Sequence, residues 1–407
     1  MRRVSAIAAC WLALGSRVGL GAVEPCAESN GPLVGRESGF IAQGATLEAQ
    51  REHCTAAVHA FAGSAGSVLG LSLNAAQPHS LRVTDLLGEA LPLNAAGSFT
   101  LGRSGEYLVH IEPADKNADA SAYSLSVACV SGCDRAYTRF PVILMHGAAG
   151  FGEILGIEYF FGVKDHLAER GVLAFTPAVD PVAGSAERGR EIMRQIDGLV
   201  QGGIARRFNL IGHSQGGVDA RYVAAHLGAD VIASVTTISS PHRGTPVADY
   251  AAELVDMTGV DTALIREALF NLTNAIGVST LDYVGQLSTL TTSGMAAFNR
   301  ETPDQPGVYY ASYAGRSCGA LDWDCQEQNQ GEIVAPYLAM THWLNQLSAG
   351  QNDGMCPVES AKWGEFKGTI PADHFDEVGH LVGITNSAFS HLEFFMGISK
   401  DLFSMGF

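Results

Sequence analysis

The stretch Phe208-Asn-Leu-Ile-Gly-His-Ser-Gln-Gly-Gly217 decides the expected fold of this chain. An apolar run ends in Gly212-x-Ser214-x-Gly216, and a sequence with helical character follows. This is the nucleophile-elbow pattern, in which a serine lies on a sharp strand-to-helix turn with its hydroxyl exposed. Glycine is needed on both sides because the turn holds the serine in a strained backbone conformation that leaves no room for neighbouring Cβ atoms. The pattern therefore predicts an activated serine on an α/β sheet.

The sequence around this stretch supports such a sheet. From Phe140 onward, apolar strand-like runs alternate with helical patterns, which predicts a mostly parallel sheet with helices on both faces. The strand-like runs are 141–145, 172–177, 208–211 and 231–238, and the helix-like runs are 159–170, 187–201 and 218–227.

Residues 26–133 have a different pattern, rich in Gly, Ala and Ser, with short alternating runs separated by turn signals. This spacing predicts a small β-sandwich-like accessory domain, joined to the rest by a linker at 131–139. The region loosely resembles the small secreted β-sandwich domains appended to bacterial proteases, and both a binding role and a purely structural role stay open. The expected strands are 68–73, 79–84, 98–101, 107–111 and 123–127.

The N-terminus has the composition of an export signal. Two arginines at positions 2 and 3 precede an apolar stretch at 4–14, which predicts a secretory signal peptide over residues 1–25. A buried N-terminal helix is the alternative. No other stretch approaches the roughly 18 apolar residues of a membrane span, so we expect no transmembrane segment and a secreted or extracellular protein.

Composition and charge narrow the class of protein. A hydrophobic content of 47% with 16% charged residues is typical of a globular chain. The net charge of -17 excludes duplex nucleic acid as an expected partner, because binding its backbone needs patches of lysine and arginine.

The cysteines fit an exported protein, in which thiols tend to pair. Cys318 and Cys325 are close enough in sequence for a small local loop, which would leave Cys356 free. The connectivity is otherwise open. The seven cysteines beyond the expected signal peptide are at positions 26, 54, 129, 133, 318, 325 and 356.

A serine hydroxyl is a poor nucleophile at neutral pH and needs an adjacent base, which a third group orients. On an elbow fold the acid follows the serine and the histidine comes last. We therefore expect Ser214 as nucleophile, Asp353 in a glycine-flanked turn as the orienting acid, and His374 as general base and acid. The competing residues are His342, His380 and His391 for the base, and Asp322, Asp324 and Asp376 for the acid.

The tetrahedral intermediate also needs backbone N–H donors aimed at its oxyanion. One donor is expected from the residue after the nucleophile, Gln215. The other is expected in the loop after the strand that ends at Met145, where Gly147 gives the backbone room to turn and Ala148 supplies the N–H.

Several blocks, in this order and spacing, resemble the secreted bacterial true lipases of the pseudomonad type. Those proteins are triacylglycerol hydrolases of the α/β-hydrolase fold, and the resemblance covers about residues 139–407. It implies the catalytic roles of Ser214, Asp353 and His374 and the oxyanion roles of Ala148 and Gln215. The blocks are 142–147, 155–160, 209–217, 221–225, 232–238, 241–244, 352–354 and 374–378.

The resemblance also implies a structural Ca²⁺ near the catalytic histidine. Its expected ligands are the carboxylate of Asp376 and the main-chain oxygens of His380 and Ile384, the hard oxygen donors that calcium takes. Where the family has a second aspartate, the nearest carboxylate here is Glu332, a departure that weakens the expectation. The alternative interpretation of Asp376 is a solvated loop carboxylate.

Residues 246–300 are inserted between two expected core strands and have helical periodicity at 263–270. By the resemblance, this insertion is a movable lid over an apolar acyl-binding surface; a fixed helical cap is the alternative. A second departure from the family is Asp219, at a position where an apolar or hydroxyl residue is usual.

The leading hypothesis is thus a secreted serine carboxylester hydrolase, foremost a triacylglycerol lipase that acts through an acyl-enzyme on Ser214. The alternatives on the same fold are a short-chain esterase, a phospholipase or a polyester depolymerase. A different class would be a non-catalytic surface or polymer-binding protein. The expected partners are a lipid or other ester substrate at an interface, with a folding chaperone as a second candidate.

Overall fold

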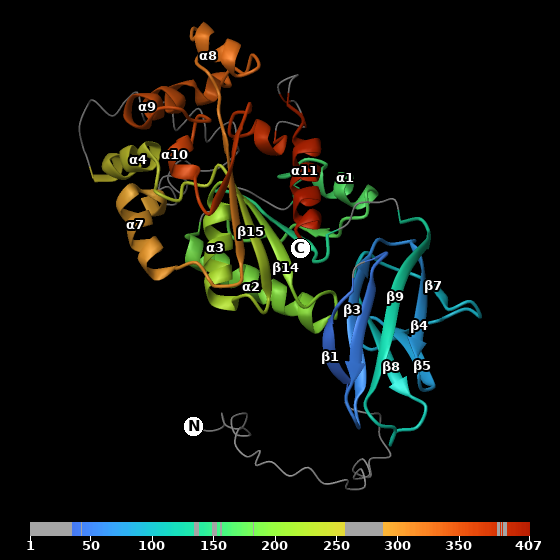
Figure 1. Ribbon diagram of the computed structural model, residues 1–407. Helices are drawn as coiled ribbons and strands as arrows, with labels where there is room; N and C mark the ends of the chain where they lie inside the picture. Colours follow the sequence, from blue (N-terminus) through green and yellow to red (C-terminus); the bar gives the residue numbers. More distant parts are fainter. Residues whose placement is uncertain are drawn as a thin grey trace, which may run out of the picture.

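The computed structural model of the protein describes residues 35–41, 43–133, 138–148, 153–154, 157–181, 183–256, 288–380, 383, 385 and 389–407. The expected signal peptide at 1–25, the 263–270 part of the expected lid and Ile384 lie outside these described residues. Figure 1 shows an all-β part, in blue and cyan, beside a larger part in which helices surround a sheet.

Two sheets form the all-β part, with strand orders β1-β3-β8-β5-β6 and β2-β9-β4-β7. All five strands expected from the sequence at 68–127 are present, and they pair antiparallel. The bounds are β1 Gly35–Phe40, β2 Thr46–Arg51, β3 Ala56–Gly63, β4 Val68–Ala75, β5 His79–Thr84, β6 Ala90–Leu91, β7 Ser98–Thr100, β8 Gly105–Pro113 and β9 Ser121–Ser131.

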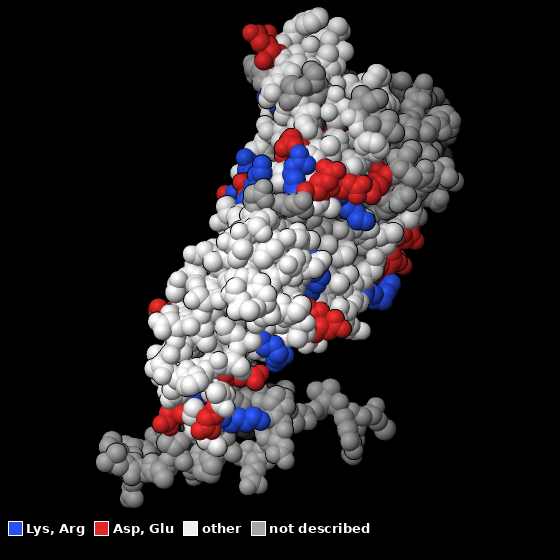
Figure 2. Space-filling model, turned by 90° about the vertical axis from the view of Figure 1, so that its right-hand side faces the viewer, with Lys and Arg blue, Asp and Glu red and all other residues white. Residues whose placement is uncertain are grey.

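The core of this part follows from the two-residue period of its strands. Along β8, Tyr107, Val109 and Ile111 are buried while the residues between them are partly exposed, so alternate side chains face the second sheet. They pack with Leu125 and Val127 of β9, as in a β-sandwich. Figure 2 shows that much of the surface of the all-β part on this side lacks charged side chains.

The larger part is built on a six-stranded sheet of order β13-β10-β14-β15-β16-β17. Every described pairing in this sheet is parallel, which confirms the parallel sheet expected from the sequence. The strands are β10 Val142–Met145, β13 Ala174–Phe175, β14 Phe208–His213, β15 Ile232–Ile238, β16 Tyr309–Gly315 and β17 Glu365–Ile370; a separate two-stranded hairpin joins β11 Glu153–Ile154 to β12 Ile157–Glu158.

Helices cover both faces of this sheet, as predicted. Successive residues of a strand point to opposite faces. Leu144 of β10 therefore packs in one cluster with α1 (Val163–Glu169) and α11 (His391–Ser404), whereas Ile143 packs with α2 (Ser185–Gln201) and α3 (Gln215–Leu227). Strands that are buried on both faces are typically rich in apolar residues, and the Val142–Met145 run is apolar throughout.

The connections after β15, β16 and β17 carry most of the remaining helices. The helix α4 lies within the expected lid insertion, and its residues Val247, Ala248 and Ala251 are buried. In the described part of the chain, no helix has the length and apolar character needed to cross a membrane. These helices are α4 Pro246–Asp256, η2 Ser288–Leu290, α7 Thr292–Glu301, α8 Trp323–Gln328, η3 Pro336–Leu338, α9 Ala339–Ala349, α10 Val358–Ala361 and η4 Asp376–Val378.

The cysteine pairing agrees with the local loop suggested by the sequence. Cys318 is bonded to Cys325, Cys129 is bonded to Cys133, and Cys356 is a buried free thiol.

Buried charge joins the sandwich to the larger part of the molecule. The carboxylate of Glu106 on β8 is almost fully buried and lies 3.5 Å from a guanidinium nitrogen of Arg139 and 3.1 Å from one of Arg206. Arg103 donates hydrogen bonds of 2.7 and 3.0 Å to the carbonyls of Ile204 and Gly203, just after α2. The contact is made near the amino-terminal end of β14, which begins at Phe208.

Candidate active site

Ser214 lies on the turn between β14 and α3, at the carboxyl end of the sheet strands. Its backbone has φ 55° and ψ −128°, a conformation that non-glycine residues rarely adopt. A Cβ at Gly216 would lie 2.6 Å from the carbonyl oxygen of His146, and one at Gly212 would overlap the backbone of Gly216 and Gly217. Both flanking positions therefore exclude any side chain, as the sequence pattern predicts.

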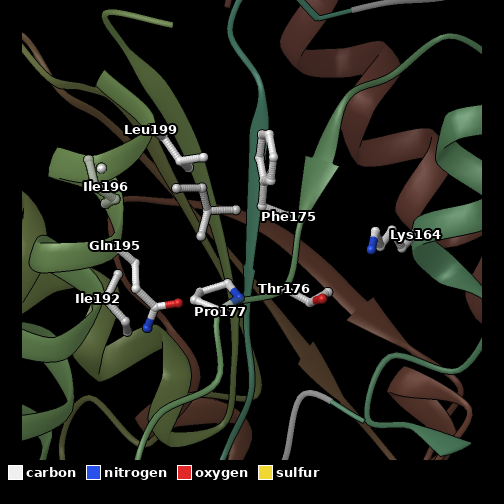
Figure 3. Close-up of a pocket in the computed structure, with 10 residues that line it drawn as sticks. Lys164, Phe175, Thr176, Pro177, Ile192, Gln195, Ile196 and Leu199 are labelled. Atoms are coloured by element: carbon white, nitrogen blue, oxygen red, sulfur yellow. The ribbon is translucent and has the colours of Figure 1, made fainter. Parts of the chain in front are cut away.

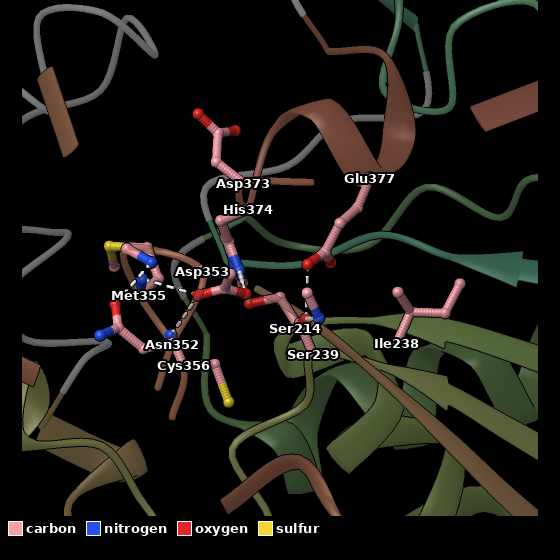
Figure 4. Close-up of polar contacts among 12 residues, drawn as sticks. Ser214, Ile238, Ser239, Asn352, Asp353, Met355, Cys356, Asp373, His374 and Glu377 are labelled. Atoms are coloured by element: carbon pink, nitrogen blue, oxygen red, sulfur yellow. Dashed lines mark hydrogen bonds and ion pairs between the residues drawn. The ribbon is translucent and has the colours of Figure 1, made fainter. Parts of the chain in front are cut away.

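The structure brings together the three side chains expected to form the triad (Figure 4). The Nε2 atom of His374 lies 2.9 Å from the hydroxyl oxygen of Ser214, and its Nδ1 atom lies 2.7 Å from Oδ2 of Asp353. All three side chains are buried. With Nδ1–H donating to the carboxylate, Nε2 is left as the acceptor for the serine proton.

Asp353 is held by its own loop. Its Oδ1 atom accepts hydrogen bonds from the backbone N–H groups of Met355, at 2.8 Å, and Cys356, at 2.6 Å. Burial by itself would raise the pKa of this carboxyl, but the charge and hydrogen bond of His374 and these two N–H groups lower the pKa below its ordinary value. The group is therefore an ionised carboxylate at neutral pH.

The competing histidines are engaged elsewhere. His342 bonds through Nε2 to the carbonyl of Ser317 at 3.1 Å, and His391 bonds to the carbonyl of Phe161 at 2.9 Å. The ring of His380 packs edge-on against Tyr159, with centroids 5.3 Å apart. Among the competing acids, Asp322 caps α8 through the N–H of Cys325, Asp324 is exposed, and Asp376 belongs to the acidic cluster described below.

The two residues expected to donate to the oxyanion lie in the segments next to Ser214. Gln215 is the first residue of α3, and Ala148 follows β10. A Cβ at Gly147 would lie 2.8 Å from the Cβ of Ser214, so the backbone before Ala148 passes directly against the nucleophile. Gly147 thus allows a close approach that no other residue could make.

A buried ion pair that the sequence reasoning did not assign fixes this loop. Arg188 of α2 donates through Nε to Asp219 of α3 at 2.6 Å, and both side chains are fully buried. The same guanidinium donates to the carbonyls of His146 and of Gly147, the latter at 3.1 Å. Asp219, noted above only as a departure from the family, therefore orients the arginine that holds the backbone of His146 and Gly147.

A second buried network, also unassigned from the sequence, lies next to the proposed triad. Glu377 accepts a 2.6 Å hydrogen bond from Ser239 (Figure 4). Glu377 also contacts Nε2 of His213 at 2.9 Å, and His213 bonds Tyr159 at 2.7 Å. Complete burial raises the pKa of Glu377 well above its usual range and lowers that of His213 well below its own. Burial thus favours the neutral form of both groups, and the ring of His213 packs against that of His374 with centroids 4.6 Å apart.

Three carboxylates form a cluster next to the triad. Oxygen atoms of Glu332, Asp373 and Asp376 lie within 4.8 Å of one another. Asp373, the residue before the catalytic-site histidine, was missed by the sequence reasoning; its carboxylate accepts hydrogen bonds from the N–H groups of Ala335, Phe375 and Asp376 at 2.9–3.0 Å. The structure thus brings Glu332 and Asp376 together, as the calcium hypothesis requires. Of the two residues expected to bind calcium through main-chain oxygens, His380 is among the residues that the structure describes and Ile384 is not.

A hollow of about 400 Å³ lies beside the edge strand β13. Figure 3 shows Phe175 and Pro177 on one side, Ile196 and Leu199 of α2 on another, and Lys164 apart from them. None of the triad residues lines this hollow. It is therefore separate from the site around Ser214.

The parallel sheet with helices on both faces and a serine elbow defines an α/β-hydrolase. No protein-family model matches the chain. The chain is similar to a triacylglycerol lipase of Pseudomonas fragi, with 32% identity over 295 residues that cover 67% of this chain and 99% of the relative. It is also similar to a triacylglycerol lipase of Vibrio cholerae, with 29% identity over 269 residues, 61% of this chain and 82% of the relative.

Among solved structures, the chain is similar to lipase 1 of Pelosinus fermentans, with a TM-score of 0.49 and 18% identity over 65% of this chain and 99% of that one. The extent and identity of the sequence match to the Pseudomonas fragi protein show that the chain belongs to the bacterial triacylglycerol lipase family. It is a carboxylic ester hydrolase.

Proposed function

We propose that this protein is an exported triacylglycerol lipase that cleaves its substrate through an acyl-enzyme on Ser214. The observation that carries the proposal is the continuous hydrogen-bond chain from Ser214 through His374 to the ionised Asp353. The names of its relatives, triacylglycerol lipases, support the substrate class.

The geometry supports a two-step reaction. Ser214 Oγ attacks the ester carbonyl while Nε2 of His374 takes its proton; the resulting imidazolium then protonates the leaving alcohol as the C–O bond breaks. Water, deprotonated by the same nitrogen, next attacks the acyl-enzyme and releases the carboxylic acid and the free serine. Asp353 holds the ring in the required tautomer and stabilises its positive charge throughout.

The N–H groups of Ala148 and Gln215 are the proposed donors to the oxyanion. Their loops meet on either side of Ser214, where the close packing of Gly147 and the Arg188 hydrogen bonds hold the backbone in place before substrate arrives. Donors that are already oriented in this way stabilise the transition state more than donors that must first reorient.

Replacing the nucleophile is the direct test. The variant Ser214→Ala should lose hydrolysis of soluble p-nitrophenyl esters by about 10⁴-fold or more, because the covalent step is removed. Its far-ultraviolet circular dichroism and melting temperature should match the wild type, and a fluorophosphonate should label the wild type only. Hydrolysis retained in Ser214→Ala, or labelling at another residue, would contradict the assignment. A wild type that neither hydrolyses the ester nor reacts with the fluorophosphonate would favour a non-catalytic binding protein.

Acyl-chain length separates the lipase from the other ester hydrolases on this fold. We expect rates on insoluble long-chain triacylglycerol emulsions to exceed those on soluble short-chain esters. Faster hydrolysis of short-chain esters, phospholipid or aliphatic polyester would instead favour an esterase, a phospholipase or a polyester depolymerase.

We also propose a structural Ca²⁺ held by Glu332, Asp373 and Asp376, with the main-chain oxygens of His380 and Ile384. Clustered, largely buried carboxylates are a donor set that suits this cation and is costly without a positive charge nearby. When bound, calcium would supply an electrostatic link between the segment before α9 and the loop that carries His374. It has no part in the covalent steps.

Removal of the ion tests this site. A chelator such as EGTA should lower the melting temperature of the wild type, and Ca²⁺ but not Mg²⁺ should restore it, because Mg²⁺ requires tighter octahedral geometry. The Asp373→Asn variant should melt near the chelated wild type and respond little to added Ca²⁺. Equal melting of the wild type with and without chelator would contradict a calcium site.

We further propose that the chain is divided into four functional segments. A signal peptide at 1–25 would direct export, residues 26–133 would form the accessory domain, residues 139–407 would form the catalytic domain, and 246–300 would form its lid. N-terminal sequencing of the protein from culture medium tests the export signal. Refolding of the purified chain, with and without cell extract, tests whether a folding chaperone takes part.

A further inference from the structure

Large apolar side chains are exposed on one connection of the hydrolase. Leu321 is 86% exposed and Trp323 is 72% exposed, both within the loop closed by the Cys318–Cys325 disulfide. Further along the same connection, Trp343 and Leu347 are exposed four positions apart, on one face of α9. Exposure of this kind costs free energy in water and indicates a contact surface. We call residues 318–325 the disulfide knob.

The knob is held rigid by more than its disulfide. Asp322 caps α8 by accepting from the N–H of Cys325 at 3.1 Å, and Gln326 donates to the carbonyls of Gly319 and Ala320 at 2.9 and 3.2 Å. Leu321 and Trp323 are therefore presented by an ordered backbone. A preordered contact loses little conformational entropy on binding.

The knob lies on the same side of the molecule as the catalytic serine. It follows β16, whose carboxyl end is at Gly315, and Ser214 follows the carboxyl end of the parallel strand β14. Figure 1 shows α8 projecting at the end of the molecule toward which β16 runs, away from the sandwich. A surface that contacts the knob would therefore face the same end of the sheet as the site.

The charge of the disulfide knob indicates which kind of surface it can contact. Between Arg316 and Lys362 the sequence has no lysine or arginine, while Asp322, Asp324 and Glu327 lie in or next to the knob. Such a segment is repelled by anionic lipid, whose attraction for proteins depends on lysine and arginine. Tryptophan and leucine instead favour the boundary between water and an uncharged apolar phase.

We propose that the disulfide knob is a lipid-contact element, which inserts Leu321 and Trp323 into an uncharged or zwitterionic ester-lipid surface. The inference rests on the proposed function, because an insoluble ester substrate is what gives such a surface to a hydrolase. It concerns adsorption to the surface and not the chemistry at Ser214, so the two can be tested apart.

The test compares full-length mature proteins in the Ser214→Ala background, which keeps the lipid intact during measurement. Partition is measured by co-sedimentation with phosphatidylcholine vesicles and by a blue shift of tryptophan emission. The double variant Leu321→Ser/Trp323→Ser should bind about 10- to 100-fold more weakly, since each side chain loses the transfer of its apolar surface. The matched control Val130→Ser/Val200→Ser, which removes two exposed valines on other surfaces, should bind as the parent does.

Activity is then measured with Ser214 present. The knob variant should hydrolyse a soluble p-nitrophenyl ester at the wild-type rate and a triacylglycerol emulsion more slowly. In the partition experiment, adding anionic phosphatidylglycerol to the vesicles should weaken binding of the parent protein. Unchanged partition of the knob variant would overturn the inference, as would a dimer that this variant abolishes without any change in lipid binding. A wild type that does not hydrolyse the soluble ester would instead contradict the proposed function, and the partition result would not be affected.

Discussion

Asp219 lies outside the proposed triad but is linked through Arg188 to the loop beside Ser214. Its carboxylate holds the guanidinium of Arg188, which in turn holds the carbonyls of His146 and Gly147 beside the nucleophile. Two charges buried together are stable only while both are present, because removing one leaves the other without compensation. The same pair therefore stabilises the protein and fixes the backbone of His146 and Gly147.

We expect Asp219→Asn to lower kcat on a soluble ester by about 10-fold or more with little change in KM, since full loss of one oxyanion donor costs about 10²–10³ in rate. Asp219→Ala should also lower the free energy of unfolding by about 3–5 kcal/mol. Rates are normalised to active sites titrated with a fluorophosphonate, and the exposed Asp197→Asn on α2 is the control. A wild-type kcat per titrated site in Asp219→Asn would show that the pair is only structural.

At the scale of elements, the strand β14, the turn at Ser214 and the helix α3 act as one unit. The turn is so tight that neighbouring backbone occupies the space where side chains would start at Gly212 and Gly216. Glycines in regular helix surface positions are different, because a methyl group there meets only solvent. Gly198 of α2 is such a position, with no atom within 4 Å of a Cβ built on it.

Replacement by alanine should change the stability of the protein in opposite directions at these two kinds of glycine. Gly216→Ala should lose most ester hydrolysis and stability, because its Cβ would overlap the carbonyls of Met145 and His146. Gly198→Ala should raise the free energy of unfolding by about 0.5–1 kcal/mol, the usual difference between glycine and alanine inside a helix. Urea unfolding and rates on a soluble ester measure both variants. Wild-type stability in Gly216→Ala would show that the elbow is looser than the structure indicates.

At the scale of the whole molecule, the sandwich is joined to the hydrolase at the amino-terminal side of the sheet, away from Ser214. Glu106 lies between Arg139 and Arg206, and Arg103 reaches the backbone after α2. These contacts do not touch the site. We therefore expect the sandwich to contribute to stability and not to ester cleavage.

Neutralising the buried acid should uncouple the two parts. Glu106→Gln should cost about 1–3 kcal/mol, less than a fully buried pair because both arginines stay partly exposed. Calorimetry should then resolve two melting transitions where the wild type has one, with unchanged hydrolysis of a soluble ester. The control is Glu112→Gln, which removes the partly exposed acid of a pair with Arg82. A single unshifted transition in Glu106→Gln would contradict this coupling.

Much of the fold could be predicted from local patterns. The strands at 142–145, 208–213 and 232–238 are mainly apolar and are buried at every position, and the sandwich strands alternate with period two. β16 and β17 were not predicted, because their small and polar residues, as in Tyr-Ala-Ser-Tyr-Ala and Glu-Phe-Lys-Gly-Thr, give no apolar run. The expected helix at 159–170 begins only at Val163, because Gly162 before it adopts a left-handed conformation.

The sequence alone was sufficient to predict the turn that carries Ser214, since the elbow depends on residues within two positions of this serine. Family order then indicated Asp353 and His374, and the structure brings them within hydrogen-bond distance. The partners of Arg188, Glu377 and Asp373 could not be predicted. A buried charge is stable only beside a specific group from a distant segment, and that pairing exists only after the sheet has brought the segments together.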